Sequence, residues 1–155
     1  MGLNCCTANG PRGLLLLPAF AWMTRASQPV VNFYSEGRAE IVLASGVRVS
    51  IGQATDYPRD DVVKLTLDPP RKTRFSLDLR IPARCSHTTL SANGTALAPP
   101  QPGTYAHIDR EWAPGDSVRL EFDLRDRMLH IAGRARGRAA DSRLRPRRVR
   151  TAGTV

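Results

Sequence analysis

The pattern of hydrophobic and polar residues changes its period once along the chain. From Gly13 to Met23 the residues are almost all apolar, and they surround a helix rather than forming one stripe on it. Asn9 can cap such a helix, Pro11 suits its first turn, and Pro18 should kink or end a turn. The pattern predicts a buried helix. Because the chain offers no second helix with a matching apolar face, we expect its packing partners to come from residues missing from this sequence.

After this helix the period becomes two, which is typical of strands. Apolar and charged residues alternate from Thr73 to Ile81 and from Val118 to Leu124, and Asn93-Gly94 is a hairpin signal between two short runs. Strand spacing with Pro and Gly turns predicts an antiparallel β-sandwich. The other expected strands are Val30–Tyr34, Ala39–Leu43, Val47–Ile51 and Val62–Leu67, with turns at Glu36-Gly37, Ser45-Gly46 and Tyr57-Pro58.

Length and charge restrict the classes of protein that fit. A chain of 155 residues with 41% hydrophobic and 24% charged residues is a soluble globular protein with one core at most. Of the net charge of +9, residues 133–155 carry eight arginines and one acid, so +7 belongs to the tail. That tail has no apolar periodicity, which predicts disorder over residues 131–155. No aromatic residue interleaves its arginines, so we do not expect it to bind nucleic acid.

The apolar run near the amino end could also be a targeting segment. It follows Arg12 and resembles a short signal peptide, but Asn4 and the cysteines beside it make a poor start for one. It is far shorter than the ~20 apolar residues of a membrane span. Gly2 before a cysteine pair resembles an acylation site, yet Cys6 stands where myristoylation requires Ser or Thr. These features favour a cytoplasmic protein with no membrane partner.

Three cysteines in a chain of this size do not form a disulfide framework. Cys5 and Cys6 are adjacent, which misplaces their sulfurs for a bond with each other. A reduced or metal-binding role is therefore favoured, and the alternative for these two and for Cys85 is a small buried side chain. The histidines at positions 87, 107 and 130 show no metal-ligand spacing. The acids Glu36, Glu40 and Glu111 fit solvated carboxylates, so no general acid can be named.

A set of segments resembles one enzyme family over residues 4–127. The pieces are Asn4-Cys5-Cys6-Thr7-Ala8-Asn9-Gly10-Pro11-Arg12-Gly13-Leu14, Leu17-Pro18, Val31-Asn32-Phe33-Tyr34, Thr55-Asp56-Tyr57-Pro58, Leu79-Arg80-Ile81-Pro82, Ala92-Asn93-Gly94 and Arg110-Glu111-Trp112 before Pro114-Gly115-Asp116. They look like the C-terminal part of the β-L-arabinofuranosidases, glycoside hydrolase family 127. The cysteine pair is the most distinctive piece. Arg84 departs from the family pattern, which usually has a tryptophan in that region, and we expect it to disturb one edge of the core.

The resemblance implies a fold and a chemistry. The fold is an (α/α)6 barrel followed by β-sandwich domains, so we expect residues 1–28 to be the end of the barrel, 29–130 the sandwich and 131–155 the tail. Cys5 would be the nucleophile and a zinc ligand, and Cys6 a second zinc ligand. The family's other zinc ligands and its acid/base glutamate lie upstream of the pair and have no counterpart here. The resemblance therefore implies a fragment of a retaining hydrolase of terminal β-L-arabinofuranosides, inactive alone, that binds zinc poorly.

A second hypothesis from a different class is a non-catalytic carbohydrate-binding or docking module. Tyr105 and Trp112 are aromatic residues that could stack on sugar faces from a β-sandwich. The competing interpretation is that both rings fill a core that has few other large side chains, since aromatic residues make up only 6% of the chain.

Overall fold

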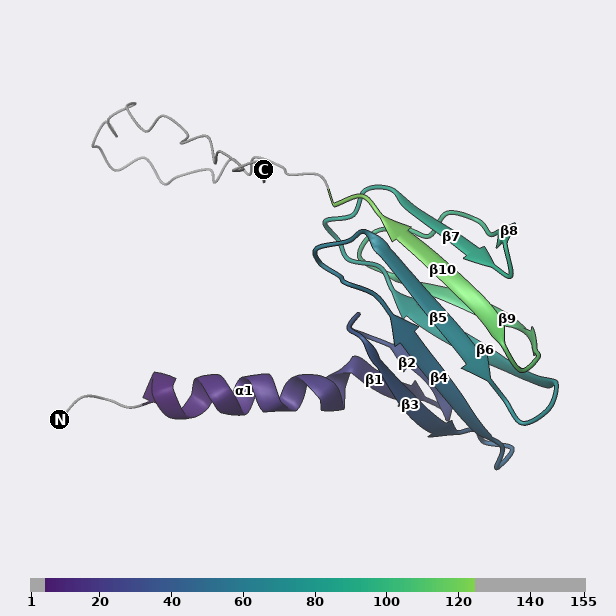
Figure 1. Cartoon of the computed structure of the whole chain (residues 1–155), viewed down its shortest axis with the longest axis horizontal. Coiled ribbons are helices and arrows are strands. Elements are labelled where there is room, and N and C mark those ends of the chain that lie inside the picture. The colour runs from purple at the N-terminus through teal and green to yellow at the C-terminus, as the bar shows by residue number, and fades with distance from the viewer. Residues whose placement is uncertain (1–4, 125–155) are drawn as a thin grey trace, which may run out of the picture. The chain divides into compact units, whose positions relative to one another are not determined.

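The computed structural model describes residues 5–124, without the side chains of residues 5–8 and Leu17. Within these residues one helix is followed by ten strands (Figure 1). The predicted tail, residues 131–155, and His130 lie outside the described part. The elements are α1 (Cys5–Ala21), β1 (Trp22–Arg25), β2 (Gln28–Val31), β3 (Gly37–Val42), β4 (Arg48–Ala54), β5 (Val62–Asp68), β6 (Thr73–Arg80), β7 (Thr88–Ala92), β8 (Thr95–Ala96), β9 (Tyr105–Trp112) and β10 (Asp116–Phe122).

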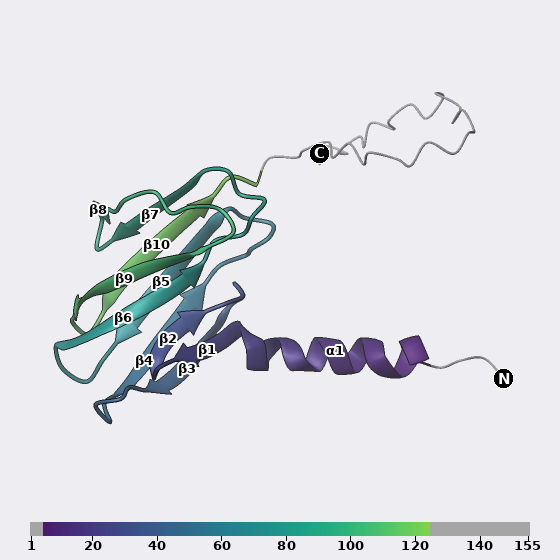
Figure 2. The same cartoon turned by 180° about the vertical axis from the view of Figure 1, so that it is seen from behind.

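The strands form two sheets that pack face to face. The four-stranded sheet has the order β1-β2-β6-β9, and the six-stranded sheet has the order β3-β4-β5-β10-β7-β8. Figure 2, seen from behind, brings β6 and β9 of the smaller sheet toward the viewer. The mainly β fold with an antiparallel sandwich is confirmed. One described pair departs from it, because β2 runs parallel to β6 with Val30 opposite Asp78.

The core lies between the sheets and follows the predicted alternation. In β10 the apolar residues Val118, Leu120 and Phe122 are buried, while the charged residues between them are exposed. Each such side chain contributes about 1.5–3 kcal/mol when it is fully buried. In β6 the outer face is not uniformly wet as predicted, because Asp78 is only 5% exposed. The cause is that other side chains of the same sheet cover this carboxylate.

The helix differs from its predicted bounds. α1 begins at Cys5 and includes both Pro11 and Pro18, so the predicted start near Asn9 is wrong. It ends at Ala21, because Trp22 pairs with Val31 as the first residue of β1 and packs against the core. Among the described residues no helix has the length and hydropathy that a membrane span requires.

The hairpin predicted at Asn93-Gly94 is present between β7 and β8. Ala92 pairs with Thr95, and the two turn residues have φ angles of 49° and 77°. These positive angles are those that Asn and Gly adopt most readily. The Asn93 side chain donates to Asp116 over 2.8 Å and accepts from the Ser117 amide over 2.7 Å. The side chain of the turn residue is therefore tied to the start of β10, and the hairpin predicted at Asn93-Gly94 is confirmed.

Candidate functional site

The two candidate cysteines stand at the amino end of α1. The structure places Cys5 and Cys6 in the first turn of this helix and does not describe their side chains. Free backbone N–H groups and the helix dipole favour negative charge at such a position, which suits a thiolate. The first turn contains no acidic residue that would oppose this effect.

The rest of α1 is apolar and uncovered. Leu14 is 67% exposed, Leu15 79% and Leu16 49%, and every described side chain from Asn9 to Phe20 is exposed. Leaving a Leu side chain in water rather than burying it forgoes about 1.5–3 kcal/mol. The described residues therefore do not supply the surroundings that this helix requires.

Asn32 holds the carboxyl end of α1 against the smaller sheet. Its backbone N–H donates to the carbonyl of Ala21 over 2.9 Å, and its Nδ2 donates to the carbonyl of Phe20 over 3.3 Å. Its Oδ1 accepts a hydrogen bond of 2.7 Å from the hydroxyl of Tyr105 in β9. The last two carbonyls of the helix thus accept from the backbone and the side chain of one residue, and that side chain is also tied to the far edge of the sheet.

A buried carboxylate lies in the smaller sheet, near the end of α1. The side chain of Asp78 is 7% exposed and accepts from Arg25 Nη1 over 3.2 Å, and its other oxygen lies 2.7 Å from Nδ1 of His107. The guanidinium of Arg25 also lies over the ring of Tyr105, 5.5 Å from its centroid. A buried charge requires such partners. This cluster joins β1, β6 and β9, and it positions the strand that follows α1.

The two aromatic residues of the binding-module hypothesis have different environments. Trp112 is fully buried, packs against Phe75 with ring centroids 5.9 Å apart, and donates from Nε1 to the carbonyl of Phe75 over 3.0 Å. The interpretation that Trp112 fills the core is therefore confirmed, and its ring is not available to stack on a sugar. Tyr105 is 38% exposed and borders an open groove of about 530 Å³ that His107 and Asp109 also line.

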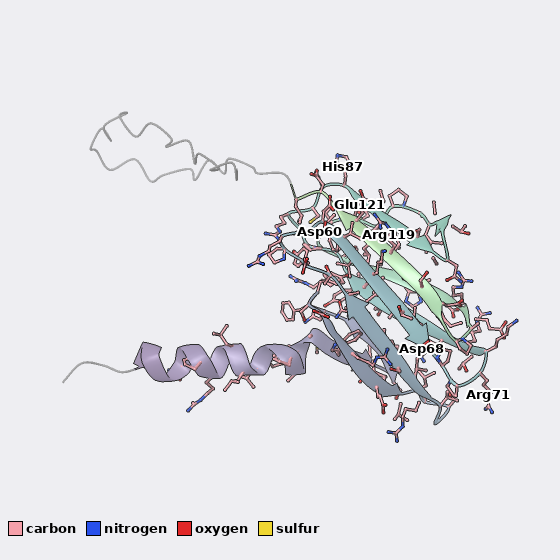
Figure 3. The ribbon with its side chains drawn as sticks, in the orientation of Figure 1. Asp60, Asp68, Arg71, His87, Arg119 and Glu121 are labelled. Carbon is pink, nitrogen blue, oxygen red and sulfur yellow. The ribbon has the colours of Figure 1, made fainter. Side chains whose placement is uncertain are left out.

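The remaining candidate residues do not gather into a site. Cys85 is buried in the core, and His87 is exposed. Of the three acids singled out, all exposed, Glu40 pairs with Arg48 over 3.2 Å. Figure 3 shows Asp60, His87 and Glu121 toward one end of the sandwich and Asp68 with Arg71 toward the other. Among the described residues no three His, Cys, Asp or Glu side chains are placed to hold a metal ion.

We expected Arg84 to disturb one edge of the core, and this prediction is wrong. Its Nη2 donates to the hydroxyl of Tyr57 over 2.7 Å, and its guanidinium lies over the same ring, 5.7 Å from the centroid. The hydrogen bond to Tyr57 raises the pKa of Arg84 above its ordinary value. The neighbouring residues Ile81 and Cys85 remain fully buried or nearly so. The arginine is accommodated because its charged end lies at the surface, on an aromatic partner.

Comparison with known proteins decides the family. The model of a family described as "Beta-L-arabinofuranosidase, GH127 middle domain" matches residues 29–124. The chain belongs to glycoside hydrolase family 127. No curated protein sequence matches it at a significant level.

Solved structures agree with this assignment. A GH127 β-L-arabinofuranosidase from Geobacillus stearothermophilus T6 is 31% identical with a TM-score of 0.71, over 77% of this chain and 19% of that one. A protein described as a glycoside hydrolase is 30% identical with a TM-score of 0.70, over 77% and 20%. A GH127 β-arabinofuranosidase is 26% identical with a TM-score of 0.68, over 79% and 22%. The family 127 chain thus spans about a fifth of the length of each of these proteins.

The match also separates the parts of the chain. The matched middle domain covers the sandwich from β2 to β10, while Cys5, Cys6 and α1 precede it. The roles of Cys5 and Cys6 stay a prediction from their sequence motif. The sequence analysis did not predict the cluster of Arg25, Asp78 and His107. These residues are far apart in the sequence, and no local pattern predicts their contact.

Proposed function

We propose that this chain carries the cysteine nucleophile and the middle domain of a retaining glycoside hydrolase that releases terminal β-L-arabinofuranosyl groups. The observation that carries the proposal is the family 127 match to residues 29–124, together with a cysteine pair in the first turn of the helix that precedes it. Two of the similar solved structures are a β-L-arabinofuranosidase and a β-arabinofuranosidase, which supports this class of substrate.

Zinc is the metal that the cysteine pair fits. Thiolates are preferred zinc ligands, and a site of about four ligands would take two from Cys5 and Cys6. The remaining ligands of such a site would come from outside this cysteine pair. When bound, zinc would keep the thiols deprotonated at neutral pH.

Cys5 has the central role in the proposed reaction. Its thiolate attacks the anomeric carbon of the arabinofuranoside, a C–S bond forms, and the glycosidic C–O bond breaks. The leaving oxygen takes a proton from a carboxylic acid. The resulting carboxylate then removes a proton from water, which attacks the same carbon, releases arabinose and returns the thiolate. Two inversions at the carbon preserve its configuration. The role of Cys6 is to hold the metal.

We further propose that residues 1–155 alone do not turn over substrate. The three acids singled out, Glu36, Glu40 and Glu111, are all exposed, and Glu40 is already paired with Arg48. The chain also spans only about a fifth of the similar solved proteins. A nucleophile without its acid loses both the leaving-group protonation and the activation of water.

Activity assays with a fusion protein test this proposal. The fusion joins the segment of the Geobacillus enzyme that precedes the position aligned with α1 to this chain, and the substrate is 4-nitrophenyl β-L-arabinofuranoside. We expect turnover by the fusion and none by the chain alone. Cys5→Ala should lower kcat by about 10⁴-fold or more, Cys6→Ala should lower zinc content, and Thr7→Ala in the same turn should change neither. Turnover that survives Cys5→Ala would contradict the nucleophile role.

The carbohydrate-binding module keeps one supporting observation, the groove beside the exposed ring of Tyr105. We propose it as the second candidate function. Calorimetric titration of the chain with arabino-oligosaccharides, repeated with Tyr105→Ala, separates it from the first. Heat of binding that Tyr105→Ala removes would support the module, and a flat titration would exclude it.

A further inference from the structure

An apolar groove runs between the open edges of the two sheets. β1 is an edge strand of the smaller sheet and β3 is an edge strand of the larger one. The two lie side by side in both Figure 1 and Figure 2. Between them is a groove of about 500 Å³, lined by Ala19, Phe20, Trp22, Met23, Thr24, Ala39, Glu40, Ile41 and Val42.

Most of the residues that line this groove are apolar, and three of them are large and exposed. Phe20 is 48% exposed, Met23 42% and Val42 53%. Its one charged lining residue, Glu40, is paired with Arg48 over 3.2 Å. Clustered exposed apolar side chains mark interaction surfaces, whereas single ones are ordinary. Phe20, Met23 and Val42 form such a cluster around the groove.

The groove is continuous with the uncovered helix. Ala19 and Phe20, at the end of α1, form one side of it, and Leu16, one helical turn before Phe20, is 49% exposed. Residues four apart lie on the same helix face, so the apolar surface runs from α1 onto β1 and β3. Any element that covers the Phe20 face of α1 therefore reaches the groove as well.

The family assignment indicates what covers this surface. The match begins at residue 29 and is to a middle domain, so relatives carry further chain before it, and α1 is the part of this chain on that side. We propose that the groove between β1 and β3 is a docking surface for the domain that precedes the middle domain in family 127 proteins, which inserts apolar side chains beside Phe20, Met23 and Val42. The inference rests on family membership and not on the chemistry of the cysteines.

Open strand edges add a second reason for a partner at this place. An edge strand presents unpaired backbone groups that proteins normally protect with charges, bulges or a covering element. In β1, Met23 is an exposed apolar residue, and in β3 Val42 is another. A second copy of the chain could cover the same edges, and this alternative is one outcome of the test.

Hydrogen exchange on the fusion described above tests the docking surface. Amide exchange is compared between the fusion and the 155-residue chain, with β8 and β9 as internal controls because they are edge strands far from the groove in the strand order. We expect residues 22–25 and 37–42 to exchange about tenfold more slowly or better in the fusion. Val42→Asp should abolish this protection, while Thr66→Asp, at an exposed position of β5, should not.

The outcomes separate the possible occupants. Equal exchange of β1 and β3 in the two proteins would overturn the proposal, and so would protection of β1 without β3. A dimer of the chain in sedimentation velocity that Val42→Asp dissociates would assign the groove to a second copy instead. Loss of activity in Cys5→Ala with unchanged protection of β1 and β3 would support the docking surface. Protection of β1 and β3 in a fusion that has no activity would also support the docking surface, but it would contradict the proposed reaction.

Discussion

At the scale of single residues, Asp78 shows how a buried charge connects three strands of the smaller sheet. Its carboxylate is covered by Arg25 from β1 and His107 from β9, and the three residues are brought together only by the sheet. The sequence placed Asp78 on a wet face, which is correct for the direction of the side chain. Its burial depends on long neighbours from two other strands, which alternation alone does not reveal.

Removing His107 should weaken the sandwich more than removing an exposed ion-pair partner. His107→Ala leaves the buried oxygen of Asp78 without its partner at 2.7 Å, which we expect to lower the free energy of unfolding by about 1–3 kcal/mol. The matched control is Arg74→Ala, which breaks the exposed pair with Asp109 and should cost less than about 1 kcal/mol. Urea unfolding measures both. Equal losses would show that Asp78 does not depend on the imidazole.

Tyr34 should make stability depend on alkaline pH. Burial raises the pKa of this phenol above its ordinary value of 10.0, and its hydroxyl donates to the carbonyl of Arg80 over 2.7 Å. The unfolded state loses the proton near pH 10 while the folded state keeps it, so the contribution is complete below that pH and declines above it. Relative to Tyr34→Phe, the chain should lose up to about 1.4 kcal/mol per pH unit above pH 10.

Urea unfolding of both proteins at several pH values checks this dependence. At neutral pH the phenylalanine variant should be less stable by about 1 kcal/mol, because the carbonyl of Arg80 loses its donor. The difference should shrink as the pH rises above 10. A difference that stays constant from neutral to alkaline pH would mean that the phenol titrates alike in both states.

At the scale of elements, strands with strict alternation or a clear turn could be predicted from sequence, and others could not. β6, β10 and the β7–β8 hairpin follow directly from their patterns. β1 was hidden because it joins the end of an apolar helix and turns at Ala26 and Ser27, which have φ angles of 49° and 59° that these residues seldom adopt. β9 mixes charged and apolar residues around the buried Trp112, whose burial is decided by the facing sheet.

The hairpin turn allows a matched pair of glycine variants. Gly94 has a φ of 77° with nothing within 4 Å of an added Cβ, so Gly94→Ala should cost about 1–2 kcal/mol through backbone strain alone. Gly37 in β3 also has open space and no positive φ, so Gly37→Ala should be neutral or stabilising by up to about 1 kcal/mol. Thermal unfolding of the two variants compares them. A larger loss for Gly37→Ala would contradict the turn assignment.

At the scale of the whole molecule, the cysteine motif and the sandwich pattern together led to the family that the comparisons confirm. What the sequence could not provide is the surface where α1, β1 and β3 meet, because it forms only after the two sheets have packed. The exposed helix and the groove form one continuous apolar surface, and both need apolar neighbours. The division into residues 1–28, 29–130 and 131–155 stays a prediction.

The most direct measurement of the account is mass spectrometry of the fusion protein trapped with a slow arabinofuranoside substrate. We expect an added pentosyl group on the peptide that contains Cys5, its loss in Cys5→Ala, and its persistence in the Thr7→Ala control. A pentosyl group on any other residue, or hydrolysis with no adduct at Cys5 under trapping conditions, would contradict the role of this cysteine as the nucleophile.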